Sequence, residues 1–201
     1  MIMAIDLTGI TNQNEFYTHH YLSEILEGDL KETFQKWTQE EESVEKTPWN
    51  AFASLRRPYF ATKSKLENVR TRESIWKNQR ELLADLLQVL GYSYVPQVKE
   101  LDDGELLPVS SEVKRADGSP SLWVIETASL PREMTDPLDE TLGRWQLPES
   151  IAEEAAIDED STLEELITRK VFSLPEPPRW ILAVSFHSWV LVDRSKWSEK
   201  R

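Results

Sequence analysis

One helix followed by a change of period constrains the fold of this chain more than any other feature. Between Arg72 and Leu90, apolar residues recur at helical spacing, and Gly91 supplies a C-terminal cap. After Gly91 the period of apolar residues changes from about 3.6 to about 2, which is typical of strands. A chain with this order is expected to pack a long helix against a sheet.

Three strands are predicted after this helix, over 92–98, 106–115 and 122–128. Asp103-Gly104 and Asp117-Gly118 are turn signals, and they separate the three runs. We therefore expect the three strands to form a meander.

A second helix and one or two strands complete the predicted core. Residues 162–172 have helical spacing, and Ser161 or Thr162 can cap them. The apolar, β-rich runs 179–184 and 189–192 are predicted to form a hairpin or one bent strand pair. From the long helix onward the order is helix, three strands, helix, strand or strands, an α/β (α+β) arrangement.

Length and composition fit one core with an extension. The chain has 201 residues, 39% of them hydrophobic, which suffices for a single core. We predict an N-terminal helical extension over 1–71 and an α/β core over 72–201. Cysteine is absent, which excludes a disulfide scaffold, a thiolate zinc site and a cysteine nucleophile. No apolar run approaches the roughly 18 residues needed to span a bilayer, so we expect a cytoplasmic protein without a membrane partner.

Three segments are predicted within the extension. Residues 12–37 have apolar positions at helical spacing, with Thr11, Asn12 or Asn14 available as the cap. Residues 39–46 are rich in glutamate and are predicted to be a charged linker.

A short helix is predicted to follow this linker. It begins at Pro48 and is expected to end where Pro58 interrupts it.

Charge is distributed unevenly along the chain. The net charge of −13 argues against a general nucleic-acid coat, because non-specific binding to phosphate depends on lysine and arginine. Yet Arg56 to Arg80 carries eight basic and two acidic residues, whereas Met134 to Glu165 carries eleven acids and one arginine. Both segments can be solvated faces. Alternatively, the basic segment contacts DNA phosphate or an acidic partner, and the acidic segment mimics DNA or docks on a basic protein. The predicted DNA contacts are Arg56, Arg57, Lys63, Lys65, Arg70 and Arg72.

The order α-β-β-β-α-β resembles the common core of the PD-(D/E)XK nuclease superfamily. Three local sequences extend the resemblance: TGITNQNEFY at 8–17, LWVIE at 122–126, and PPRWIL at 177–182 leading to VDRSKW at 192–197. Together they resemble the N-terminal region of large adenine-specific DNA methyltransferases of the type IIG restriction-modification kind, including those of phage-defence systems such as DISARM. The resemblance covers nearly the whole chain.

This resemblance implies a bacterial DNA-modification or phage-defence enzyme. DNA, and a methyltransferase domain or another subunit of the same system, are the partners that it implies. The chain itself has neither the glycine-rich turn that binds S-adenosylmethionine in those enzymes nor an Asn-Pro-Pro-Tyr-like motif. A catalytic methyltransferase is therefore expected after Arg201 in a longer gene product, or else the chain is a fragment or a stand-alone remnant.

A nuclease site is also implied by the resemblance. In the PD-(D/E)XK family the third strand carries Glu-x-Lys, and an acid lies upstream. Glu126 occupies the position of that glutamate, but Ala128 stands where the family has lysine. On the second strand, Glu112 and Lys114 themselves form Glu-x-Lys and share one face of the strand.

Two interpretations of this site follow. In one, the chain is an active endonuclease in which Glu112, Lys114 and Glu126 are catalytic and the two glutamates bind magnesium. In the other, the nuclease is degenerate, and the fold serves DNA engagement or docking within a larger enzyme.

Overall fold

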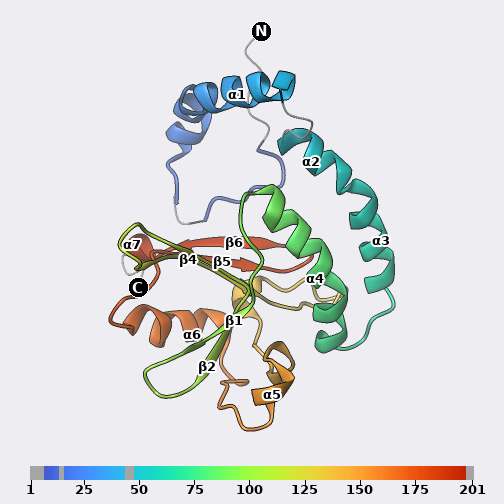
Figure 1. The fold of residues 1–201 in the computed structure, drawn as a ribbon, viewed down its shortest axis with the longest axis vertical. Helices are drawn as coiled ribbons and strands as arrows, with labels where there is room; N and C mark the ends of the chain where they lie inside the picture. The colour runs from blue at the N-terminus through green and yellow to red at the C-terminus, as the bar shows by residue number, and fades with distance from the viewer. Residues whose placement is uncertain (1–6, 14–15, 44–47, 198–201) are drawn as a thin grey trace.

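The computed structural model describes residues 7–13, 16–43 and 48–197, which form a mixed α/β structure (Figure 1). The α-helices are α1 (Leu26–Ser43), α2 (Pro48–Ser54), α3 (Arg56–Leu66), α4 (Arg72–Val89), α5 (Glu149–Ala152), α6 (Leu163–Arg169) and α7 (Arg194–Trp197). The strands are β1 (Gln97–Glu100), β2 (Leu106–Val109), β3 (Ser111–Lys114), β4 (Pro120–Glu126), β5 (Trp180–Val184) and β6 (Trp189–Asp193). A π-helical turn spans Tyr21–Ile25, and 3₁₀ turns span Pro137–Asp139, Arg144–Gln146 and Val171–Ser173.

Four strands form the main sheet, in the order β3-β4-β5-β6. The β3–β4 and β5–β6 pairs are antiparallel, whereas β4 and β5 are parallel. Parallel neighbours need a crossover, and the segment between β4 and β5 contains α6. The mixed α/β (α+β) class and the C-terminal hairpin, both predicted from the sequence, are confirmed.

Helices cover both faces of this sheet (Figure 1). On one face, Leu83 and Leu87 of α4 are buried against Val124 of β4. On the other face, Ile167 of α6 is buried with Ile125 of the same strand. The alternation of side chains along β4 thus supplies both halves of the core.

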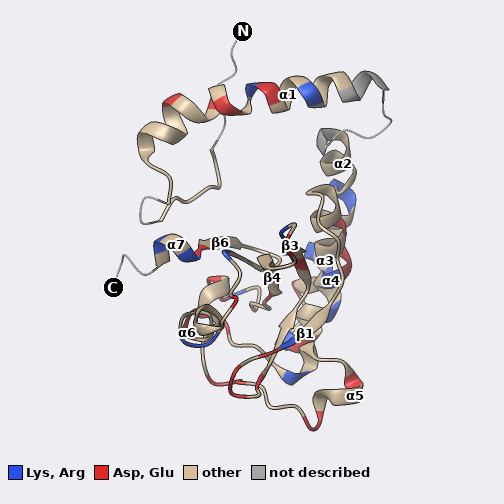
Figure 2. Ribbon diagram, turned by 60° about the vertical axis from the view of Figure 1, so that its left-hand side comes forward, with Lys and Arg blue, Asp and Glu red and all other residues tan. Residues whose placement is uncertain are grey.

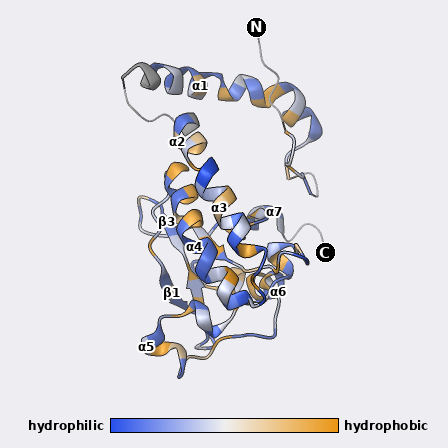
Figure 3. Cartoon of the chain, turned by 90° about the vertical axis from the view of Figure 1, so that its right-hand side faces the viewer, coloured by the Kyte–Doolittle hydropathy of each residue, from blue (hydrophilic) through white to orange (hydrophobic). Residues whose placement is uncertain are grey.

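The α2–α3 arm lies outside α4, as a further layer (Figures 1 and 3). Its inner side is apolar: Leu66 is buried in one cluster with Ile75 of α4 and Phe186 of the β5–β6 turn. Tyr59 stacks on the same Phe186 ring, with centroids 5.1 Å apart. Helix α3 therefore packs directly on the segment predicted to begin the core.

Helices α4 and α6 form where the sequence predicts them. Thr71 caps α4 by accepting a hydrogen bond from the amide of Ser74, and Gly91 follows the helix with φ +86°. Thr162 and Glu165 form a reciprocal capping box at the start of α6. Strong local signals at both ends explain these agreements.

The N-terminal helix begins later than predicted and ends later. Asn12 does not cap it; its side chain is hydrogen-bonded to the backbone of Tyr17, and helical structure follows Thr18, whose hydroxyl accepts from the amide of Tyr21. The predicted charged linker over 39–46 is wrong for residues 39–43, which are the last part of α1. The rest of that linker, and Asn14, lie outside the described residues.

Pro58 does not end a helix as predicted. It occupies the first turn of α3, which begins at Arg56 and continues to Leu66. The amides of a first turn have no intrahelical acceptor, so a proline there loses no hydrogen bond.

The first two predicted strands differ from those of the structure: β1 covers only the end of the predicted strand 92–98 and continues to Glu100, and the predicted strand 106–115 is broken at Ser110. The carbonyl of Ser110 accepts from Val95, while its amide donates to Val124 of β4. The second predicted strand is thus split into β2, which pairs with β1, and β3, which pairs with β4. The three-strand meander is correspondingly divided between two sheets.

Across the described residues, the structure contains no helix of the length and apolarity needed to cross a membrane.

Candidate functional site

Glu126 ends β4 as a buried carboxyl group that is 2% exposed. Its Oε1 accepts hydrogen bonds from the hydroxyls of Ser110 and Tyr94, each 2.7 Å away. Its Oε2 is also buried and has no hydrogen-bond partner among the described residues. Burial raises the pKa of Glu126 because it disfavours the charged carboxylate.

Arg80 of α4 contacts this carboxyl group through Tyr94. Its Nε donates to the Tyr94 hydroxyl at 2.8 Å, and its guanidinium lies 4.1 Å above the ring of Trp76. Burial, with the negative field of Glu126, raises the pKa of Tyr94, so the phenol stays neutral and donates. The chain from Arg80 to Glu126 is a structural hydrogen-bond network between α4 and the sheet.

Two glutamines fix the backbone around the end of β4. Gln79, which is fully buried, donates to the carbonyl of Thr127 at 2.7 Å and accepts from the amide of Phe186 at 3.2 Å. Gln146 donates to the carbonyl of Glu126 at 2.8 Å. Neither glutamine was among the site residues predicted from the sequence.

Glu112 lies on the other face of the sheet. It is in register with Trp123 of β4, and the indole of Trp123 donates to its Oε1 at 2.9 Å. Trp123 belongs to the cluster under α6, whereas Glu126 faces Tyr94 and α4. Trp123 and Glu126 occupy odd and even positions of β4, so their side chains point to opposite faces of the sheet. Glu112, which is paired with Trp123, therefore lies on the face opposite to Glu126.

Lys114 shares the face of Glu112, as the two-residue spacing predicts. Its Nζ lies 3.6 Å from Glu112 Oε2, while Lys99 of β1 lies 2.8 Å from Oε1. Partial burial opposes ionisation of Glu112, but the hydrogen bonds from Lys99 and Trp123 outweigh that effect and lower its pKa. Glu112 is thus an ionised carboxylate that already has cationic partners.

The structure therefore does not bring the predicted magnesium ligands together. Magnesium is held by oxygen ligands that converge on one point, and Glu112 and Glu126 project from opposite faces. Within the described residues there is also no group of three or more histidine, aspartate or glutamate side chains placed to hold a metal ion.

Helix α3 forms an exposed basic surface (Figure 2). Thr62 and Leu66 face inward and are buried, and the sequence of the helix contains no acidic residue. Four of the six predicted DNA contacts lie on this helix and are all exposed: Arg56, Arg57, Lys63 and Lys65.

The remaining two predicted DNA contacts have different surroundings. Arg70 is exposed and its guanidinium donates to the carbonyls of Glu67 and Val69. Arg72 forms an ion pair with the fully buried Glu140 at 2.9 Å and donates to Thr141. Arg72 therefore neutralises an internal carboxylate and is not part of the basic surface.

The acidic segment gathers around α5 and the loops beside it, away from the α2–α3 arm (Figure 2). Part of its charge is used internally: Glu159 pairs with Arg144 at 3.3 Å, and Asp158 pairs with Lys170 at the same distance. These contacts tie the loop to itself and to the end of α6.

No family model, no curated protein and no solved structure matches this chain. Its function is therefore inferred from the geometry of the described residues.

Proposed function

We propose that this chain is a DNA-engaging, non-cleaving domain with a degenerate PD-(D/E)XK-like core. It would belong to a cytoplasmic DNA-modification, restriction or phage-defence system and work beside a methyltransferase domain or another subunit. The observation that carries the proposal is the exposed face of α3, which has four basic side chains, while the helix contains no acidic residue. Phosphate contacts by lysine and arginine supply most of the non-specific affinity for DNA.

The order of elements supports the proposed core. Helix α4 precedes the strands and helix α6 precedes β5, in keeping with the resemblance, although four strands, β1 to β4, lie where the resemblance has three. Under this proposal, Glu126 at the end of β4 corresponds to the family's strand acid.

The surroundings of Glu126 support a core that does not cleave. Hydrolysis of a phosphodiester with metal ions needs converging oxygen ligands and an ion that activates water. Glu126 is buried among hydroxyl donors, Ala128 replaces the expected lysine, and Lys114 pairs with Glu112 on the opposite face. Each part of a cleavage site is missing or engaged elsewhere among the described residues.

DNA binding is tested by fluorescence anisotropy with a labelled duplex at several salt concentrations. The double variant Arg57→Glu/Lys63→Glu is expected to lose at least about tenfold in affinity and to flatten the salt dependence by about two units of slope. The matched control is Arg115→Glu/Arg132→Glu, which makes the same change of net charge at exposed arginines outside the arm. Equal losses in both variants would show that only net charge matters and would refute a binding surface on α3.

The absence of cleavage is tested separately on unmodified plasmid with magnesium or manganese. We expect no nicking by the wild-type chain. Metal-dependent nicking that disappears in folded Glu126→Ala would instead establish the active endonuclease.

A further inference from the structure

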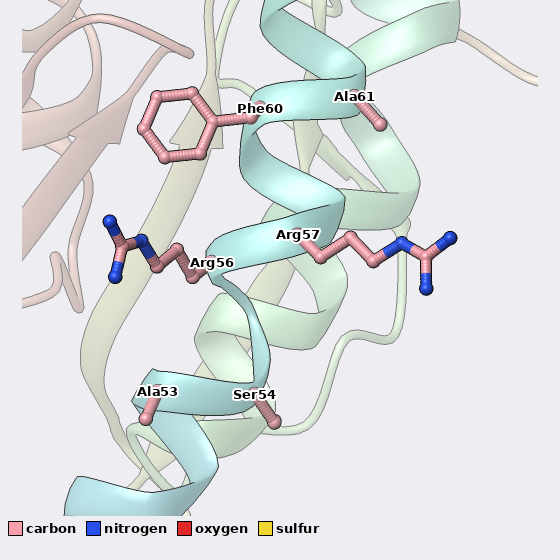
Figure 4. Close-up of a pocket in the computed structure, with 6 residues that line it drawn as sticks. All are labelled: Ala53, Ser54, Arg56, Arg57, Phe60 and Ala61. Carbon is pink, nitrogen blue, oxygen red and sulfur yellow. The ribbon is translucent and has the colours of Figure 1, made fainter.

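A hollow lies on the outside of the arm, where α2 meets α3 (Figure 4). We call it the α2–α3 hollow; it is lined by Ala53, Ser54, Arg56, Arg57, Phe60 and Ala61. The two alanines and the serine are small, so the long side chains of the other three form its walls. Figure 4 shows Arg56 and Phe60 on one flank of α3, and Arg57 and Ala61 on the other.

Phe60 is an outward-facing ring beside the hollow. The residue is 53% exposed, although exposing an aromatic ring to water is unfavourable. Its ring and that of Tyr59 form an edge-to-face pair, and Tyr59 in turn stacks on Phe186 in the core. The three rings therefore connect Phe60 to the core.

Cations stand on either side of this ring along the helix. Arg56, Phe60 and Lys63 follow one another at i, i+4 and i+7, so they share one side of α3. The rise of a helix places Arg56 and Lys63 about 10 Å apart along the axis, with the ring between them. An aromatic platform within a positively charged track is the arrangement by which proteins bind single strands of nucleic acid.

We propose that the α2–α3 hollow binds single-stranded DNA, with an unpaired base stacked on Phe60 and the neighbouring phosphates on Arg56 and Lys63. This inference rests on the proposed function, and it specifies that the basic surface of α3 prefers single-stranded DNA to a duplex.

Charge and ring chemistry favour a single strand over the other candidates. A phenyl ring offers no hydrogen bond to the base edges that a duplex displays in its grooves, but its face matches the face of an unstacked base. Cations on both sides, and no acid in α3, fit a polyanion.

The test uses the full chain and three labelled probes of equal length: oligothymidylate, a fully paired duplex, and a duplex with an unpaired central bubble. Wild-type protein is expected to bind oligothymidylate and the bubble more tightly than the duplex. Phe60→Ala is expected to lose about 5-fold to 150-fold in affinity for the unpaired probes, the range for loss of one base–aromatic contact, and to keep its affinity for the duplex. Phe60→Tyr keeps the ring and should bind like wild type.

Each other outcome overturns the inference in a distinguishable way. Equal affinity for all three probes, unchanged in Phe60→Ala, would refute base stacking while leaving DNA binding by α3 intact. Full affinity in Phe60→Leu would show that any apolar side chain suffices, which also refutes stacking. Absence of binding to every probe would overturn the proposed function as well. Because Phe60 is exposed, thermal unfolding of all variants should match wild type and serves as the folding control.

Discussion

Glu126 is a carboxyl group that the fold keeps away from water, and its protonation should leave a signature in stability. Burial raises its pKa above the ordinary value of 4.5. At pH values between 4.5 and the raised pKa, the folded state holds more protons than the unfolded state. The contribution of this group to the free energy of unfolding is therefore greatest below pH 4.5 and decreases as the pH rises through that window.

Glu126→Gln should remove this dependence on pH. Glutamine has the same shape, and its Oε1 can still accept from Ser110 and Tyr94. The difference in unfolding free energy, wild type minus variant, should fall as the pH rises from 4.5, as measured by urea unfolding at a series of pH values. Parallel curves would mean that Glu126 titrates normally. Glu126→Ala should cost about 1–3 kcal/mol, because the hydroxyls of the buried Ser110 and the partly buried Tyr94 lose their acceptor.

Gln79 gives a second prediction at this scale. Its amide bonds both the end of β4 and the β5–β6 turn to α4. Gln79→Ala leaves a buried carbonyl and a buried amide without partners, so we expect a loss of about 2–4 kcal/mol in unfolding free energy. Gln88→Ala, at an exposed position of the same helix, is the control and should cost less than about 0.5 kcal/mol. Similar values for the two variants would contradict the role given to Gln79.

The sequence held a signal for Gln79 but none for its neighbours. Gln79 occupies the apolar stripe of α4 between Ile75 and Leu82, and a polar residue in such a stripe must find an internal partner. Tyr94 lies in an extended segment without a motif, so nothing local points it at Glu126. Nor does spacing along the chain determine strand register, and register alone separates Glu112 from Glu126.

At the scale of elements, Leu66 decides whether α3 folds with the core. It is 1% exposed and shares a cluster with Ile75 and Phe186. Leu66→Ala should lower the unfolding free energy by about 2–5 kcal/mol and keep a single transition. A second transition, or no loss of stability, would show that the arm unfolds independently. Phe60→Ala is the matched control on the same helix, because it removes a larger apolar side chain from an exposed position.

The helices and strands were predictable from the sequence where local signals agree, but not where tertiary contacts determine where an element begins or ends. Helix α4 has a stripe, a cap at Thr71 and a glycine at its end, and all three point to one structure. Helix α3 is not predictable from the usual role of proline as a helix breaker, because Pro58 lies in the first turn, where a proline loses no hydrogen bond. The break at Ser110 has no local cause, since it follows from the change of pairing partner from β1 to β4.

In the described structure, basic and acidic residues are separated only in part (Figure 2). The basic surface lies on α3, whereas acidic residues gather around α5 and also along α1. A net charge of −13 repels DNA at long range and opposes the attraction of the α3 cations, so binding through α3 should depend strongly on the orientation of approach. The local excess of cations on α3 is compatible with the proposed DNA-binding surface on an acidic chain.

The same layering predicts how far the chain can be shortened. Helix α1 makes its most extensive contacts with the turn that precedes it. The segment before it meets the core through Phe16, whose ring lies 6.0 Å from Trp180, and through Lys196, which donates to the Phe16 carbonyl and lies over the rings of Phe16 and Tyr17. Removal of residues 1–43 should therefore cost one aromatic contact and the exposed contacts of Lys196, together about 1–3 kcal/mol, and lower the melting temperature by a few degrees.

Removal of residues 1–66 should have a different result, because it takes away Leu66 and Tyr59 and uncovers Ile75 and Phe186. Exposure of this cluster is expected to abolish cooperative unfolding or to lower the melting temperature by more than about 10 °C. Calorimetry of the two truncated chains beside the full chain distinguishes these outcomes. If both truncated chains melted like the full chain, the arm would not be part of the folded core, and a DNA-binding surface on it would need a partner to hold it in place. A large decrease of the melting temperature only in the chain that lacks residues 1–66 would show that the core itself positions α3.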